Sequence, residues 1–228
     1  MTGSVLLHLS PYGLEEPMFG RYAFVQDQVA LMHEAIIKVK TILESLGRPP
    51  ERIFFTPGRE SQALALATAR ILQVDAQPWP AGGTNLAGLI VADDLAAVPV
   101  EVLKTLRDHR AGQVLWSHAT SWIDEGPFAA DLVTFLYQTR IGPWTEGRLH
   151  SDPATRETTR LPAAPGTPHE LADQILAAPP ESAPDEPLLT LAQKAARITN
   201  PTAGGTWRTT GTRRRQRTDS PVQSARFN

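Results

Sequence analysis

The stretch from Gly88 to His109, GLIVADDLAAVPVEVLKTLRDH, constrains the fold most strongly. A short apolar run, Leu89 to Val91, precedes two acids, Asp93 and Asp94, and an amphipathic segment that starts at a proline follows. This order is typical of a buried strand, a loop at its carboxyl end and a returning helix. Because ligands bind just outside such strand ends in open α/β sheets, the acid pair is a candidate binding site.

Strand-like and helix-like segments alternate on both sides of this unit. Short apolar runs bounded by turn residues predict strands, and apolar positions that recur every three or four residues predict helices. The predicted strands cover residues 5–9, 52–56, 74–80, 89–91 and 113–116, and the predicted helices cover residues 24–46, 61–72, 99–111 and 127–140. Such alternation favours a mostly parallel sheet with right-handed crossovers. The sequence therefore predicts a Rossmann-like α/β domain over residues 1–146, with helices on both faces of the sheet.

The composition changes after this predicted domain. Residues 147–198 contain eight prolines, so we interpret them as a Pro-rich linker with one or two short helices. Thr167 and Glu170 form a capping-box pattern that predicts the start of one helix, and residues 187–198 could form another. The sequence leaves open whether this linker packs on the α/β domain. From there on few side chains can be buried, which predicts a basic, disordered tail over residues 199–228.

Charge is distributed unevenly along the chain. The net charge is −2, but residues 194–228 carry +7 and the rest carries −9. Flexible arginines can neutralise phosphates without reading sequence, and the nearby aromatic Trp207 can stack on a base. The candidate contacts to a nucleic acid or an acidic protein partner are Arg213, Arg214, Arg215 and Arg217. A solvated tail is the alternative interpretation.

Several classes of site are excluded by composition. The chain has no cysteine, which excludes disulfides, thiolate catalysis and thiolate metal sites. No apolar run approaches the roughly 18 residues of a membrane span. The N-terminal apolar run VLLHL is too short for a signal peptide. We therefore expect a cytoplasmic protein without membrane contact.

Two predicted strand ends carry side chains suited to ligands. Asp93 and Asp94 could hold Mg²⁺ or the hydroxyls of a ribose, because carboxylate oxygens suit hard cations and diols. Residues 56–61 precede a helix, whose first N–H groups could form an anion site together with the side chains of Arg59 and Ser61. Each feature has a simpler interpretation. Asp94 or a neighbour could cap the next turn, and residues 56–61 could be a capping loop with a surface arginine.

The two segments together resemble the core of the type I phosphoribosyltransferases. The resemblance lies in TPGRESQALALATARILQV and GLIVADDLAAVPVEVLKTLRDHRAGQV and covers about residues 52–116. In that family a loop before an alanine-rich helix binds pyrophosphate, and two acids at a later strand end hold the ribose of phosphoribosyl pyrophosphate with magnesium. The residues that match the pyrophosphate loop are Gly58, Arg59 and Ser61, and those that match the acid pair are Asp93 and Asp94.

One part of the family's pattern is missing. After the acid pair the family has a Thr/Gly-rich loop that cradles the 5′-phosphate, whereas residues 95–100 contain no hydroxyl, no glycine and a proline. That composition removes donors that a phosphate requires. We therefore expect a catalytically degenerate, phosphoribosyltransferase-like module that binds a ligand or a partner. No cofactor is evident, and magnesium is implied only for an active transferase.

Two alternative functions remain from the sequence. The chain could be an active enzyme on a phosphorylated or nucleotide substrate, by phosphoribosyl transfer or as a phosphatase. Two histidines at predicted strand ends, His8 and His118, suggest the plan of the histidine phosphatases, but Leu7-His8-Leu9 does not match that family's Arg-His-Gly motif. A satisfied structural histidine is the simpler interpretation. The second alternative assigns the function to the basic tail.

Overall fold

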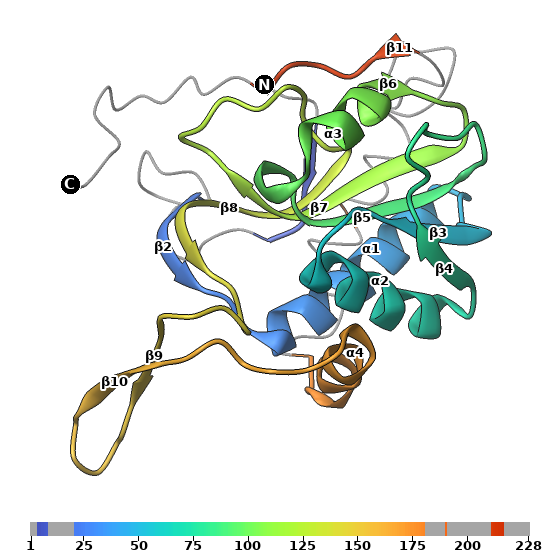
Figure 1. Cartoon of the computed structure of the whole chain (residues 1–228). Helices are drawn as coiled ribbons and strands as arrows, with labels where there is room; N and C mark the ends of the chain where they lie inside the picture. The colour runs from blue at the N-terminus through green and yellow to red at the C-terminus, as the bar shows by residue number, and fades with distance from the viewer. Residues whose placement is uncertain (1–3, 9–20, 181–189, 191–210, 217–228) are drawn as a thin grey trace.

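The computed structural model describes residues 4–8, 21–180, 190 and 211–216 of the 228-residue chain. At its centre lies a seven-stranded sheet in which every paired strand is parallel (Figure 1). The strand order is β1-β8-β7-β5-β3-β4, and β2 also pairs with β8. The bounds are β1 (Val5–Leu6), β2 (Arg21–Gln26), β3 (Arg52–Phe55), β4 (Asp75–Pro78), β5 (Gly88–Asp94), β7 (Gln113–Ser121) and β8 (Leu132–Ile141).

Helices cover both faces of this sheet (Figure 1), as the sequence predicts. One face carries α1 (Val29–Ser45) and α2 (Arg59–Leu72), against which α4 (Pro168–Ala177) packs, and the other carries the short η1 (Leu95–Ala97) and α3 (Val100–Leu106). Consecutive residues of β5 contribute to different cores: Leu89 packs in the cluster with Trp116, and Ile90 packs in the cluster with Leu115. This alternation follows from the period of two in a strand. It explains why β5 reads as a continuous apolar run.

The predicted helix over residues 127–140 is wrong. Residues 132–141 form strand β8, which lies between β7 and the edge strands β1 and β2. The first half of β8 is buried on both faces, so apolar residues occupy consecutive positions and include helix-like spacings. Periodicity alone does not separate such a strand from a buried helix. As a result an irregular segment, residues 122–131, connects β7 to β8 in place of a helix.

Two other boundaries differ from the prediction. The helix expected from residue 24 begins at Val29, because residues 21–26 pair with β8 as an edge strand. Strand β7 extends to Ser121 rather than ending at Trp116. His118 therefore lies inside a strand and not in the loop that follows it.

Part of the Pro-rich extension packs on the domain. Helix α4 begins with the predicted capping box, in which Thr167 and Glu170 each bond to the other's backbone. Its residues Leu171 and Ile175 are buried in the same core as α1 and α2. Before α4, β9 (Arg148–Ser151) and β10 (Thr158–Leu161) form a hairpin that projects from the body (Figure 1). The second predicted helix, residues 187–198, lies outside the described residues except for Thr190.

Residues 211–216, which we call the C-terminal strap, are docked on the α3 face. Strand β11 (Gly211–Thr212) pairs antiparallel with β6 (Asp108–His109). Further along the strap, Ala129 N–H donates to Arg214 O, and the Gln216 amide donates to Ser121 O. The strap thus lies against the irregular segment that joins β7 to β8. This corrects the expectation of disorder for these six residues, and the rest of the predicted tail lies outside the described residues.

Arg213 anchors the strap through a buried ion pair. Its side chain is 1% exposed, its guanidinium contacts the carboxylate of Asp131, and its Nε donates to Leu106 O at 3.0 Å. Asp131 also accepts from Leu115 N–H at 2.7 Å and lies 2.7 Å from His109 Nε2. Burial alone would raise the pKa of Asp131, but the charge of Arg213 and the contacts with His109 and Leu115 hold it below its usual value.

We expect Arg213→Gln to lower the free energy of unfolding by about 3 kcal/mol or more, because it leaves the buried carboxylate of Asp131 without its cation. Urea denaturation monitored by tryptophan fluorescence measures the change. Arg214→Gln alters the exposed neighbouring arginine and serves as the control, with an expected effect within about 0.5 kcal/mol. Equal stabilities of the two variants would contradict a structural role for the strap.

Candidate functional site

Strands β3 and β5 mark the point where the sheet reverses its winding. They are neighbours in the sheet, but the chain leaves β3 into α2 on one face and leaves β5 into η1 and α3 on the other. Open α/β sheets bind ligands outside the carboxyl ends of strands at such a switch point. Both loops that the sequence singles out emerge here. This carboxyl rim is therefore the candidate functional site.

Ser61 connects the two loops directly. Its hydroxyl oxygen accepts a hydrogen bond from Asp93 N–H at 2.9 Å and lies 3.2 Å from the hydroxyl of Thr56. Gly58, with a φ of +126°, directs the chain into α2 and provides no side-chain cap for it. Ser61 is 4% exposed. The sequence-predicted residues of the two loops thus lie together, but the Ser61 hydroxyl points into the fold.

Arg59 forms its hydrogen bonds with residues other than the acid pair. Its Nε and Nη2 donate to Glu60 Oε1 at 3.2 and 3.0 Å, and its Nη1 donates to Ala164 O at 2.9 Å. The guanidinium therefore attaches the segment before α4 to the start of α2. Local sequence gives no signal for this contact, because the two residues are 105 positions apart.

Arg140, which the sequence does not single out, is the central residue of the rim. Its Nη1 and Nη2 donate to the two carboxylate oxygens of Asp93 at 2.7 and 2.8 Å. Its Nε and Nη2 also donate to Asp27 Oδ2 at 3.1 and 2.6 Å. The side chain of Arg140 is 8% exposed. Two-point guanidinium–carboxylate contacts of this kind are among the strongest hydrogen bonds in proteins.

His118 is enclosed on the other side of Asp27. Its Nε2 lies 3.2 Å from Asp27 Oδ2 and its Nδ1 lies 3.2 Å from the Thr134 hydroxyl. Both His118 and Thr134 are fully buried. A phosphoryl acceptor must be reachable by its substrate, so the burial of His118 argues against the histidine phosphatase plan. It is the satisfied structural histidine of the simpler interpretation.

Asp94 has partners for both carboxylate oxygens. Oδ1 accepts from Ala96 N–H at 2.9 Å, which caps η1, and Oδ2 accepts the hydroxyl hydrogen of Tyr137. Burial raises the pKa of Asp94 above its usual value, and the two hydrogen bonds, which lower the pKa, offset this rise only in part. Burial and the neighbouring carboxylate also raise the pKa of Tyr137. The capping interpretation of Asp94 is therefore correct, with the addition of the Tyr137 contact.

All four oxygens of the acid pair thus accept hydrogen bonds from the chain itself. Mg²⁺ binds carboxylate oxygens, and here the positively charged guanidinium of Arg140 already lies against one of the two carboxylates and would repel the ion. Within the described part of the chain, no group of three or more acidic or histidine side chains could hold a metal ion. The residues at the rim do not fit a magnesium ion in this arrangement. What they do is hold the ends of β2, β5 and β8 together.

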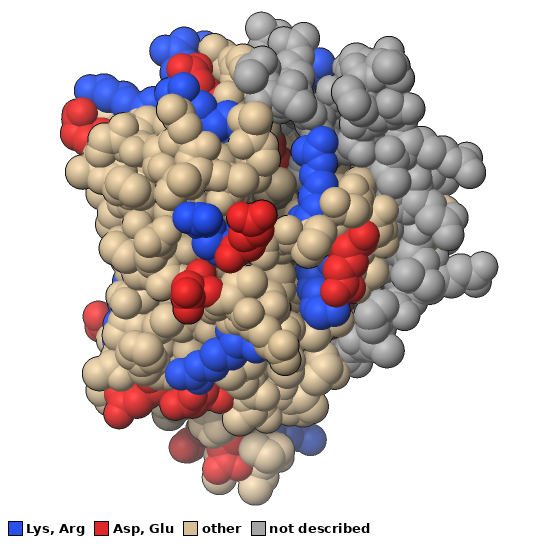
Figure 2. Space-filling model, turned by 90° about the vertical axis from the view of Figure 1, so that its right-hand side faces the viewer, with Lys and Arg blue, Asp and Glu red and all other residues tan. Residues whose placement is uncertain are grey.

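The tail arginines separate into different environments. Arg213 is buried against Asp131, so the expectation that it contacts a partner is wrong. Arg215 forms an exposed ion pair with Glu125, Arg214 is exposed, and Arg217 lies outside the described residues. On the face shown in Figure 2, acidic and basic side chains of the described residues are interspersed. Among the described helices, none is long and apolar enough to span a membrane.

We expect the rim to make stability fall on acidification. Burial alone would raise the pKa of Asp27, but His118 and Arg140 lower it to about 2, against 3.8 for an unperturbed carboxyl. Between these values the unfolded state binds more protons, so the stability that Asp27 contributes above pH 4 is lost as the pH falls towards 2. The shift corresponds to about 2 kcal/mol. Urea midpoints measured across this range should decline less steeply in Asp27→Asn than in the unmodified chain.

The control for this prediction is Asp75→Asn, which alters an exposed carboxylate on the edge strand β4. The stability of this variant should decline with falling pH as steeply as that of the unmodified chain. Asp131 retains its own acid dependence in both variants, so Asp27→Asn reduces the decline and does not abolish it. Identical pH profiles for Asp27→Asn and the unmodified chain would contradict the assignment.

Comparison with known proteins gives one partial likeness in structure. No protein-family model matches the chain, and no curated protein matches it. The crystal structure of purine phosphoribosyltransferase from Pyrococcus horikoshii Ot3 matches with 16% identity and a TM-score of 0.40, over 58% of this chain and 99% of that chain. This is a distant and partial resemblance, as the sequence predicts. At this TM-score it carries no argument about activity, so the function is argued from the geometry of the rim.

Proposed function

We propose that this chain is a ligand- or partner-binding α/β module with a phosphoribosyltransferase-like core, and that it does not transfer a phosphoribosyl group. The observation that carries the proposal is the guanidinium of Arg140, which occupies both carboxylate oxygens of Asp93. In the family that the sequence resembles, the matching acid binds the ribose. In this chain the guanidinium of Arg140 forms hydrogen bonds with the same oxygens.

Displacing Arg140 would be costly. A ribose or a magnesium ion at Asp93 requires the guanidinium to move, which leaves buried charges at Arg140 and Asp27 without full compensation. Breaking a buried ion pair in this way costs about 3–5 kcal/mol. A guanidinium that stayed in place would repel the metal. Binding of phosphoribosyl pyrophosphate would have to overcome one of these costs.

The segment after the acid pair supports the same conclusion. Leu95 and Val98 are 7% and 5% exposed and pack in the core on the α3 face. In the family, the matching loop is open and cradles the 5′-phosphate. A segment that contributes apolar side chains to the core does not present hydroxyl donors to a ligand. At the rim, the first N–H groups of α2 have no side-chain cap and could attract an anion.

Isothermal titration calorimetry with phosphoribosyl pyrophosphate and MgCl₂ tests the proposal. We expect no saturable heat up to millimolar ligand, because the acid pair and the 95–100 segment are both engaged within the fold. An active phosphoribosyltransferase titrated in the same buffer controls for the ligand. Saturable binding that Asp93→Asn abolishes and Asp75→Asn leaves intact would overturn the proposal and favour the transferase alternative.

A further inference from the structure

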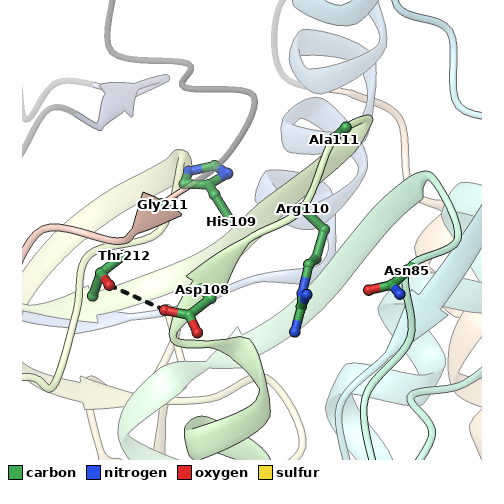
Figure 3. Close-up of a pocket in the computed structure, with 7 residues that line it drawn as sticks. All are labelled: Asn85, Asp108, His109, Arg110, Ala111, Gly211 and Thr212. Atoms are coloured by element: carbon green, nitrogen blue, oxygen red, sulfur yellow. Dashed lines mark hydrogen bonds between the residues drawn. The ribbon is translucent and has the colours of Figure 1, made fainter.

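The amino-terminal edge of the sheet, opposite the rim, carries an open cavity of about 610 Å³. Ligand pockets in proteins commonly measure about 300–1,000 Å³. Three segments that are distant in sequence form its walls: the loop before β5, the turn before β7 and the C-terminal strap. The lining residues are Asn85, Asp108, His109, Arg110, Ala111, Gly211 and Thr212 (Figure 3).

Buried contacts fix the first two walls relative to each other. Gln113 is 4% exposed, and its amide donates to Thr84 O and Leu86 O, each at 2.8 Å. Gly112, with a φ of +76°, packs so close to Ala87 that a Cβ in its place would lie 2.6 Å from the Ala87 Cβ. The strap, the third wall, is fixed by the buried contacts of Arg213. The cavity is therefore preformed by the fold.

The polar side chains that line the cavity, Asp108, Arg110 and Asn85, belong to exposed residues. All three line the cavity; in Figure 3 Asn85 points towards Arg110, and the Asp108 carboxylate is turned towards Thr212. Among the described residues, neither the Arg110 guanidinium nor the Asn85 amide has a hydrogen-bond partner, and Asp108 forms no ion pair. Asp108 Oδ1 accepts only from the Thr212 hydroxyl, at 3.1 Å. One cation, one anion and one amide thus surround the cavity without being paired to one another.

We propose that this cavity binds a small zwitterion of the α-amino acid class, with its carboxylate at Arg110 and its ammonium at Asp108. A simple anion near Arg110 also meets the carboxylate of Asp108, so the two interactions offset each other. A simple cation near Asp108 meets Arg110 in the same way. A ligand with both charges satisfies both side chains, and Asn85 supplies a donor and an acceptor.

This inference rests on the proposed function, because it names the ligand class of a binding module. It also connects the ligand to the strap, whose residues Gly211 and Thr212 form one wall. A ligand that binds only when the strap is docked stabilises the docked state by mass action. Ligand binding should therefore slow hydrogen exchange at Arg213 N–H, which donates to Arg107 O at 2.8 Å.

A thermal-shift screen of the standard free amino acids at millimolar concentration, followed by calorimetry, tests the proposal on the full chain. We expect at least one amino acid to raise the midpoint and to bind saturably. Arg110→Gln and Asp108→Asn should each weaken that binding by about tenfold or more. The amide of the same amino acid, which lacks the carboxylate, and its N-acetyl derivative, which lacks the ammonium, should lose affinity similarly.

Arg107→Gln is the matched control, because Arg107 is an exposed arginine next to the cavity that does not line it. It should leave the affinity unchanged. Three results would overturn the proposal: binding by no amino acid, unchanged affinity in Arg110→Gln, or binding of inorganic phosphate that Asp108→Asn strengthens. The last result would indicate a simple anion site. None of them affects the titration with phosphoribosyl pyrophosphate, which tests the other end of the sheet.

Discussion

The contact of Arg140 with Asp93 and Asp27 determines what the carboxyl rim can do. Parallel strands bring their carboxyl ends to one edge, and here two of those ends bring carboxylates into a region of low exposure. Burying such charges is tolerated only when a cation pairs with them. Arg140 provides that cation from β8 and holds three strand ends together. Both oxygens of Asp93 are thereby engaged by Arg140 in this structure.

A second arginine–aspartate pair, Arg213 with Asp131, attaches the strap to the sheet. The chain passes from β7 to β8 without a crossover helix, so the α3 face of the sheet needs another cover. The strap lies against this connection, and Arg213 matches the carboxylate of Asp131 at the start of β8. A residue close to the C-terminus thus stabilises the same strand that carries Arg140. The basic tail is, in this part, a component of the fold.

The sequence predicts those features that depend on neighbouring residues. The β5 unit, the capping box at Thr167 and the meeting of the two loops all follow from local patterns and from parallel strand geometry. Strand β8 could not be predicted, because burial on both faces gives it apolar positions at helical as well as strand spacing. The role of Arg140 was missed with it, since only a strand places that residue at the rim. Arg213 and Asp131 are 82 positions apart, and no local pattern relates them.

The two ends of the sheet therefore differ in what they leave for a ligand. At the carboxyl rim, the carboxylates of Asp27 and Asp93 pair with Arg140, and Asp94 accepts the hydroxyl hydrogen of Tyr137. At the amino edge, Asp108 and Arg110 are two residues apart, and successive side chains on one side of an extended segment are separated by about 7 Å. Among the described residues these two side chains form no ion pair with each other, and a small molecule that carries both charges can bridge them. The proposed ligand site therefore rests on charges that the described residues leave unpaired, rather than on the position favoured by α/β topology.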